Sequence, residues 1–595
     1  MKSYNFNKLN EPIISRNLIV LVFVLYIFWL FKTYNGNHHT VYLHMWKFVF
    51  GTYSFENDFW LQRTHHHKVS IMYHLFKYLK INPDNDYIGF LIHILFSTIS
   101  GFFLFKIIKN FTSIKETNGS LIIIFSLLMI GSILVYGNFA SWIIRFQAAP
   151  SYFGHQLIFV FIWLLLVRKP FWLFIISSLM LLIMVKATWF TVGVGMLYSV
   201  LFIKPFKKNF WIIGPIIALG YLSSQSINTD YDTNLLLFNS LIERDVEEVA
   251  FHLQQKNHLP NFIALIISFP IYFLMLKKFE ENSFKKLAQT LFISSILCFV
   301  FGYIYALYGD RIWPEPRLLA LSATRALGLY QLFFWILLSL TIYKLNIYQI
   351  YKVALLSSLF YTLTLSTDSF LFSLLILLFS FLIIKFYKHN NFLSLKNLIL
   401  NKSLKFSYFS TLLFFLMLAP GIVYLFANHF KHVDFYALKK INKWTMGLME
   451  HDNDRLDTAI MLQKCDDFNL LDLKTDSKGN LIYYETIGAV AGKSTYYGGV
   501  NWNYFDLKTH RMSKFRLNIV QNINKNIQKK IQIDNREKDE LLKTGVVVII
   551  DDDKKQFFPN DITTIDLKNS NTLLLFLNIN KKDSFIKNCK QFLKV

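Results

Sequence analysis

The dominant pattern along the chain is a series of apolar runs, each about 20 residues long, separated by short polar segments. A run of that length is what an α-helix needs to cross the hydrocarbon core of a bilayer, so the pattern predicts about thirteen transmembrane helices. The predicted helices start near Asn17, Tyr87, Ser120, Tyr152, Phe171, Trp189, Phe210, Asn261, Leu287, Leu329, Val353, Ser369 and Ser407.

The pattern changes after residue 426. The segment 427–595 is polar and mixes helical signals with short apolar runs rich in β-branched residues, such as Gly545–Ile550 (GVVVII) and Thr572–Leu577 (TLLLFL). Runs of this length and composition favour strands. We therefore predict a polytopic α-helical transmembrane domain, residues 1–426, followed by a soluble α/β domain, residues 427–595.

Lysine and arginine residues gather in every second loop between the predicted helices. Because cytoplasmic loops carry the excess of these residues, one orientation satisfies all the clusters, with the N-terminus in the cytoplasm. We expect a multi-pass protein of the inner (plasma) membrane. Residues 33–86 then form a first outer loop, and the loops near 226–260 and 308–325 and the domain 427–595 also lie outside the cytoplasm.

The composition agrees with a membrane protein, since the chain is 54% hydrophobic and 17% aromatic. The net charge of +24 could indicate nucleic acid, but its lysines lie between apolar runs, as in loops that meet lipid headgroups. We expect no nucleic-acid partner. Cys298 lies in an apolar run, while Cys465 and Cys589 follow residue 426 and are equally compatible with a disulfide and with free thiols.

The first outer loop carries the candidate catalytic residues. Val41–Phe50 and Val69–Leu79 place apolar residues at helical spacing, which predicts two amphipathic helices in the membrane interface. Glu56 and Asp58 lie between them, flanked by aromatic residues. A carboxylate there could act as a general base on an acceptor hydroxyl, with Asp58 the first choice and Glu56 its partner. The alternative is that both simply cap or solvate a short helix.

Arg63, His65 and His66 follow in the same loop and are candidates for contacts with a sugar or a phosphate. Consecutive histidines cannot all point to one ion, and no carboxylate or cysteine stands at ligand spacing nearby. We predict no metal site here. A divalent cation, Mg²⁺ or Mn²⁺, stays open as a cofactor.

The loop 308–325 contains Arg311, Arg317 and Arg325, with Pro314 and Pro316 between them. Guanidinium groups offer forked donors that suit phosphate oxygens, so these arginines are candidates for holding a lipid-linked phosphate. Arg145, in an earlier outer loop, is a candidate of the same kind. The alternative partners are lipid headgroups or the acidic residues of loop 226–260.

This layout resembles the GT-C superfamily of integral-membrane glycosyltransferases, to which oligosaccharyltransferase catalytic subunits, protein mannosyltransferases and bacterial lipid A aminoarabinose transferases belong. The resemblance covers most of the chain and rests on the number of spans, the acidic first outer loop and the outer C-terminal domain. It implies a polyprenyl-phosphate-linked sugar donor and a catalytic carboxylate at Glu56 or Asp58. The chain has no Trp-Trp-Asp-Tyr-Gly motif, and Glu-Asn-Asp replaces the Asp-Glu pair of the mannosyltransferases. We therefore expect a separate bacterial branch, and the identity of its sugar does not follow from the resemblance.

The expected function is transfer of a sugar from such a donor to a glycan, lipid or protein acceptor outside the cytoplasm. Two alternatives stay open. One is an enzyme of the O-antigen polymerase or ligase type, in which arginine and histidine do the work. The other is a transporter of polysaccharide or lipid, which the nearly charge-free span interiors disfavour.

Overall fold

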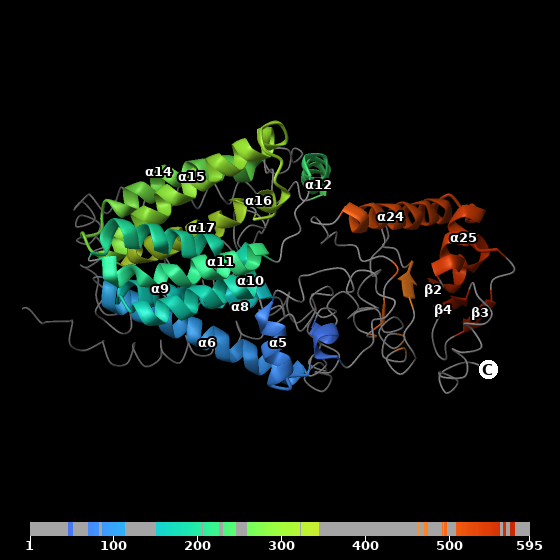
Figure 1. The fold of residues 1–595 in the computed structure, drawn as a ribbon, viewed down its shortest axis with the longest axis horizontal. Coiled ribbons are helices and arrows are strands. Elements are labelled where there is room, and N and C mark those ends of the chain that lie inside the picture. The colour runs from blue at the N-terminus through green and yellow to red at the C-terminus, as the bar shows by residue number, and fades with distance from the viewer. Residues whose placement is uncertain are drawn as a thin grey trace, which may run out of the picture.

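A computed structural model describes residues 46–51, 70–82, 86–112, 150–204, 206–224, 230–244, 259–321, 323–343, 469–473, 507–544, 546–559, 563–566 and 572–576, and single residues between 458 and 496. These residues form a bundle of helices and a smaller part that contains a sheet (Figure 1). The helices of the bundle are α5 (Ile71–Tyr78), α6 (Asp86–Phe111), α8 (Pro150–Gln156), α9 (Ile158–Leu166), α10 (Pro170–Phe202), η2 (Phe206–Ile212), α11 (Ile213–Ser224), α12 (Tyr231–Arg244), α14 (Leu259–Leu276), α15 (Ser283–Ile312), α16 (Pro316–Ala320) and α17 (Ala323–Tyr343).

The helical character predicted for this domain is confirmed. The predicted helix starts near Tyr87, Tyr152, Phe171, Trp189, Phe210, Asn261, Leu287 and Leu329 all fall in these helices. Those near Asn17, Ser120, Val353, Ser369 and Ser407 lie outside the described residues. The total of thirteen spans therefore stays a prediction.

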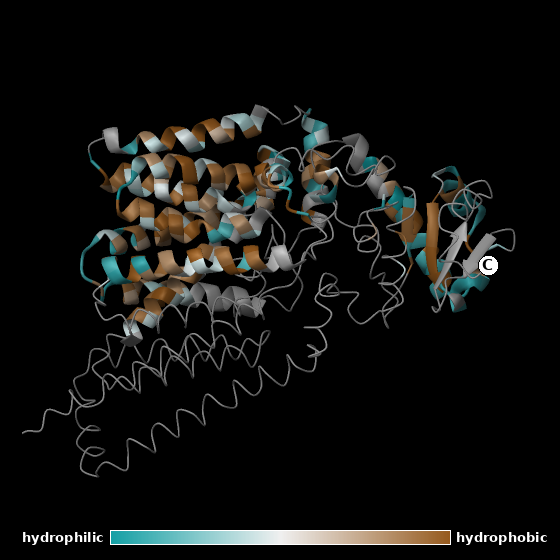
Figure 2. Cartoon of the chain, turned by 90° about the horizontal axis from the view of Figure 1, so that it is seen from below, coloured by the Kyte–Doolittle hydropathy of each residue, from teal (hydrophilic) through white to brown (hydrophobic). Residues whose placement is uncertain are grey.

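Within the described residues, Leu91–Phe111 and Ser283–Ile312 are long and apolar enough to cross a membrane. Only 33% and 28% of their apolar windows are buried inside the protein, whereas the core helix of a soluble protein is mostly buried. On α15, for example, Leu297 and Phe301 expose 62% and 59% of their surface. Apolar colouring runs along the helices and hydrophilic colouring gathers in the turns (Figure 2). Such apolar outer faces suit contact with lipid.

Helix α10 is a pair of apolar segments, Pro170–Lys186 and Thr188–Phe202, joined by a bend. Met184 leaves the helical conformation (φ −161°, ψ 94°). The Thr188 hydroxyl lies 2.9 Å from the Met180 carbonyl oxygen and 3.0 Å from that of Met184. It thus offers a donor to the carbonyl groups that the bend frees, as apolar surroundings require. The two spans predicted here correspond to these two segments.

Several turns between the helices meet at one end of the bundle. The Asn282 side-chain amide donates to the Phe111 carbonyl (3.2 Å), which joins the end of α6 to the start of α15. The Lys286 Nζ atom lies 5.5 Å from the centre of the Phe202 ring, at the end of α10. We call this the basic end, because it holds Lys106, Lys109, Arg168, Lys169, Lys204, Lys277, Lys278, Lys285 and Lys286. The basic clusters predicted after spans two, four, six and eight therefore lie together.

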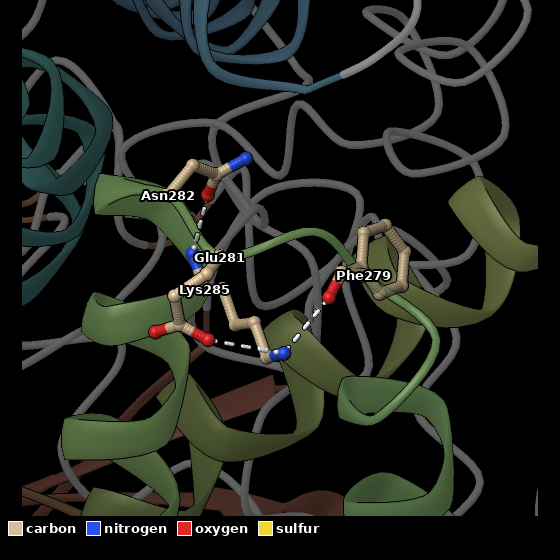
Figure 3. A network of polar contacts seen from close by, with 4 residues as sticks. All are labelled: Phe279, Glu281, Asn282 and Lys285. Carbon is tan, nitrogen blue, oxygen red and sulfur yellow. Dashed lines mark hydrogen bonds and ion pairs between the residues drawn. The ribbon is translucent and has the colours of Figure 1, made fainter.

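The turn between α14 and α15 is fixed by its own polar side chains (Figure 3). Asn282 caps α15 by accepting the Lys285 N–H (2.9 Å). The Lys285 ammonium donates to the Phe279 carbonyl (2.8 Å) and pairs with Glu281 (3.1 Å). A capped start of this kind satisfies orphan N–H groups at the end of an apolar helix.

The smaller part contains a four-stranded sheet in the order β1-β2-β4-β3. Strand β1 (Asn469–Asp472) runs parallel to β2 (Val546–Asp551), while β4 (Thr572–Phe576) is antiparallel to β2 and to β3 (Thr563–Asp566). Helices α24 (Leu507–Gln528) and α25 (Asn535–Thr544) lie between β1 and β2 in sequence. The two strands predicted from GVVVII and TLLLFL are confirmed.

Helix α25 begins with a reciprocal cap. The Asp534 carboxylate accepts the Glu537 N–H and the Glu537 carboxylate accepts the Asp534 N–H, both at 3.0 Å. Hydrogen bonds from the side chain and backbone of Glu537 hold the pKa of Asp534 below its usual value, and burial raises the pKa of Glu537. Both carboxyl groups lie outside the apolar bundle.

Two glycines in the second half of α10 test the close packing of the bundle. A methyl group at Gly195 would stand 2.4 Å from the Phe161 ring of α9, whereas one at Gly193 meets nothing within 4 Å. We expect Gly195→Ala to destabilise the fold by about 1–3 kcal/mol, because the ring must shift. Gly193→Ala should be neutral or stabilise by up to about 1 kcal/mol. Thermal unfolding in detergent measures both, and equal effects would contradict the described contact.

Candidate functional site

Both flanks of the candidate catalytic segment lie at the bundle end opposite the basic end. Residues 46–50 are helical, Gly51 follows with φ +80°, and the chain is described again from Ser70 into α5. The centre of the Trp46 ring lies 5.0 Å from that of Phe76 of α5. The ring centres of Phe76 and of Phe153, in α8, are 5.5 Å apart. The two flanks thus dock side by side on the bundle. Helical structure is confirmed for the described parts of the two predicted amphipathic helices.

These contacts belong to a cluster of buried side chains that we call the docking cluster. Its members are Trp46, Val49, Met72, Tyr73, Phe76, Tyr152, Phe153 and Ile183. The candidate residues Glu56, Asp58, Arg63, His65 and His66 lie outside the described residues, as does Arg145. The docking cluster therefore fixes the described residues on both sides of the segment that carries the first five, up to Gly51 and from Ser70.

We call residues 308–325 the arginine segment. It is more helical than predicted, and its interpretation as a loop is wrong. Helix α15 continues to Ile312, so Arg311 lies exposed in its last turn. Arg317 is in α16 and Arg325 is in the first turn of α17, and the structure describes the backbone of both. Only residues 313–315 lie outside the helices between α15 and α16, because α15 contains no proline and continues until Pro314 is near.

The short link from α15 to α16 is held by Tyr305. Its hydroxyl lies 2.8 Å from the Trp313 carbonyl oxygen and accepts the Glu315 N–H at 3.0 Å. Glu315 itself is buried, 8% exposed, between the two prolines. Sequence reasoning passed over Glu315, since a lone carboxylate between prolines gives no sign of burial. Tyr305 therefore holds the link between the helix that contains Arg311 and the helix that contains Arg317.

Helix α12 packs against α15 and α16. It was not predicted, because residues 226–260 were interpreted as a loop. Its Phe238 ring packs on Tyr305 (5.6 Å between centroids) and over Gly309, where a methyl group would stand 2.8 Å from the ring. The Tyr231 hydroxyl donates to the Asp310 carbonyl (3.2 Å). Buried Thr233, Leu237 and Phe238 show a helical spacing that could have revealed the helix. Helix α12 also contacts α24, so it links the arginine segment to the sheet-containing part.

The bend of α10 contacts both the docking cluster and the arginine segment. Ile183 belongs to the docking cluster, and Met184 packs against it. A few residues on, the Trp189 indole N–H donates to the Leu321 carbonyl (3.1 Å), just after α16. The flanks of the candidate catalytic segment and the residue after α16 thus contact the same bend.

No protein-family model, curated protein or solved structure matches this chain significantly.

The residues that the structure describes contain no group of three or more His, Cys, Asp or Glu side chains placed to hold a metal ion. The Mg²⁺ or Mn²⁺ cofactor stays a prediction. Cys298 packs against the main core of the bundle, as expected, while Cys465 and Cys589 lie outside the described residues.

Removal of the Tyr305 hydroxyl tests how the arginine segment is held. Tyr305→Phe leaves the Glu315 N–H and the Trp313 carbonyl without this partner, and we expect local destabilisation of about 1–3 kcal/mol. Hydrogen exchange of a peptide covering 313–320 should accelerate accordingly. Tyr308→Phe, in the same helix at an exposed position, is the control. Unchanged exchange in Tyr305→Phe would show that the hydroxyl does not hold the link.

Proposed function

We propose that this chain is a membrane glycosyltransferase of the GT-C type. It transfers a sugar from a polyprenyl-phosphate-linked donor to a glycan, lipid or protein acceptor outside the cytoplasm. The observation that carries the proposal is the shared bend of α10, against which both the docking cluster and the arginine segment lie. A carboxylate segment with both flanks docked at one end of an apolar bundle, and a cationic segment at the same end, would suit a substrate with a charged head and a lipid tail.

Each group has a chemical role in the proposal. The Asp58 carboxylate takes the proton of the acceptor hydroxyl as that oxygen bonds to the anomeric carbon. The bond from this carbon to the phosphate oxygen breaks, and the polyprenyl phosphate leaves with the electron pair. Glu56 supports Asp58, while Arg63, His65 and His66 contact the donor sugar or phosphate.

The arginines hold the negative charge of the leaving phosphate. Arg311 is exposed at the end of α15, Arg317 lies in α16, and Arg325 lies in the first turn of α17. Guanidinium groups suit this task because they stay charged and bind phosphate oxygens through two N–H groups. Arg145 is proposed as a further contact.

The proposed orientation places the basic end in the cytoplasm, since lysine-rich turns favour that side. The site and residues 427–595 then lie outside. The contact between α12 and α24 supports a role for the sheet-containing part above the site, where it would bind the acceptor.

The test is transfer by the purified full-length protein in lipid nanodiscs, given radiolabelled polyprenyl-phosphate sugars. Asp58→Asn removes the base and should lower the transfer rate about a hundredfold to ten-thousandfold, without changing thermal stability. Asp232→Asn, at an exposed position at the start of α12, should transfer at the normal rate.

Full transfer by Asp58→Asn would overturn the role of this residue. If Arg317→Ala then abolished the reaction, the polymerase or ligase class would be favoured instead, because arginine is the working group there.

A further inference from the structure

Three polar side chains of the apolar helix α6 and its neighbour α8 are buried where the two helices meet. His93 and Ser97 of α6 are 0% and 1% exposed, and Tyr152 of α8 is 1% exposed. Ionisable and polar residues within apolar spans are costly and usually have a function. None of these three residues belongs to the proposed reaction.

The three side chains converge on one hydroxyl group. The Tyr152 hydroxyl oxygen lies 2.8 Å from His93 Nδ1 and 3.2 Å from Ser97 Oγ. Ser97 Oγ is also 3.3 Å from His93 Nδ1, since the two residues are one helical turn apart. Satisfied networks of this kind in a low-dielectric interior fix a single arrangement of their members.

Tyr152 connects this network to the candidate site. Its ring is a member of the docking cluster and contacts the Phe153 ring at 5.3 Å between centroids. Phe153 in turn packs edge-on against Phe76 of α5. The position of the Tyr152 side chain therefore shapes the surface on which residues 46–50 and α5 dock.

We infer that His93 and Ser97 are positioning residues, which hold the Tyr152 side chain so that α5 and residues 46–50 stay docked on the bundle. An apolar residue at position 93 would fill the space but would remove the contact that His93 Nδ1 makes with the tyrosine hydroxyl at 2.8 Å. The catalytic consequence rests on the proposed function, whereas the structural consequence does not.

Hydrogen exchange of α5 in nanodiscs tests the structural consequence. Tyr152→Phe keeps the ring and removes the hydroxyl, and His93→Gln moves the side-chain amide away from the position of Nδ1. Both should accelerate exchange of the α5 amides about fivefold to tenfold through local opening. His93→Asn places its amide near the position of Nδ1 and should restore exchange close to the wild-type rate.

A matched control is Tyr330→Phe, which removes a buried hydroxyl bonded to Ser268 (2.8 Å) away from the docking cluster. It should leave α5 unchanged. The inference is overturned if Tyr152→Phe and His93→Gln leave α5 exchange unchanged. It is also overturned if they accelerate α15 as much as α5, or if His93→Asn behaves like His93→Gln.

The catalytic consequence has its own readout. With saturating donor, kcat should fall in Tyr152→Phe and His93→Gln and stay near the wild-type value in His93→Asn, because the flanks hold the segment that carries Asp58. The KM for the donor should rise in the same two variants, since Arg63, His65 and His66 belong to that segment. If the wild-type protein transfers no sugar, the proposed function fails, and the exchange experiment still decides the positioning role.

Discussion

The bend in α10 is the constraint on which the rest of this arrangement depends. A helix that breaks in apolar surroundings frees carbonyl groups that water cannot reach, and each unsatisfied group costs several kcal/mol. The Thr188 hydroxyl lies within hydrogen-bonding distance of two of these carbonyls, so the bend has a defined geometry. Because the docking cluster and Leu321 both contact this bend, its geometry fixes the position of the two flanks relative to the end of α16.

Packing within the bundle relies on close contact between helices, which is how apolar helices associate where lipid replaces water. Small residues allow that contact: Gly195 admits the Phe161 ring, and Gly309 admits the Phe238 ring. At the basic end, polar side chains cap helices and fix the turns instead, as Asn282 and Lys285 do. Close packing at small residues and hydrogen bonds thus act together, the latter both at the turns and at buried pairs such as Tyr330 and Ser268.

Much of the helical domain could be predicted because run length and helix period are local properties of the sequence. The strands β2 and β4 were found in the same way. The continuation of α15 to Ile312 was missed, because Gly309, Asp310 and Arg311 are typical of a loop although the first proline comes only at Pro314. Helix α12 was missed because its apolar face is short, although the spacing of Thr233, Leu237 and Phe238 could have indicated a helix.

The candidate site was less accessible to prediction for a physical reason. Arg311 and Arg317 could be proposed from residue type. The Tyr305 link depends instead on how the chain turns back after α15, and the His93 network on a contact with Tyr152, far away in the sequence. The roles of Asp58 and Glu56 stay predictions, since these residues lie outside the described part of the chain.

The most direct test of the account is cysteine labelling with a membrane-impermeant maleimide, in a background where Cys298, Cys465 and Cys589 are replaced by serine. Single cysteines would be placed at Tyr78 and Asp232, near the candidate site, and at Lys169 and Lys278, at the basic end. We predict labelling of the first pair in intact cells, and of the second pair only after permeabilisation. Labelling of both pairs from the same side, or of the basic end alone in intact cells, would contradict the proposed placement of the site outside the cytoplasm.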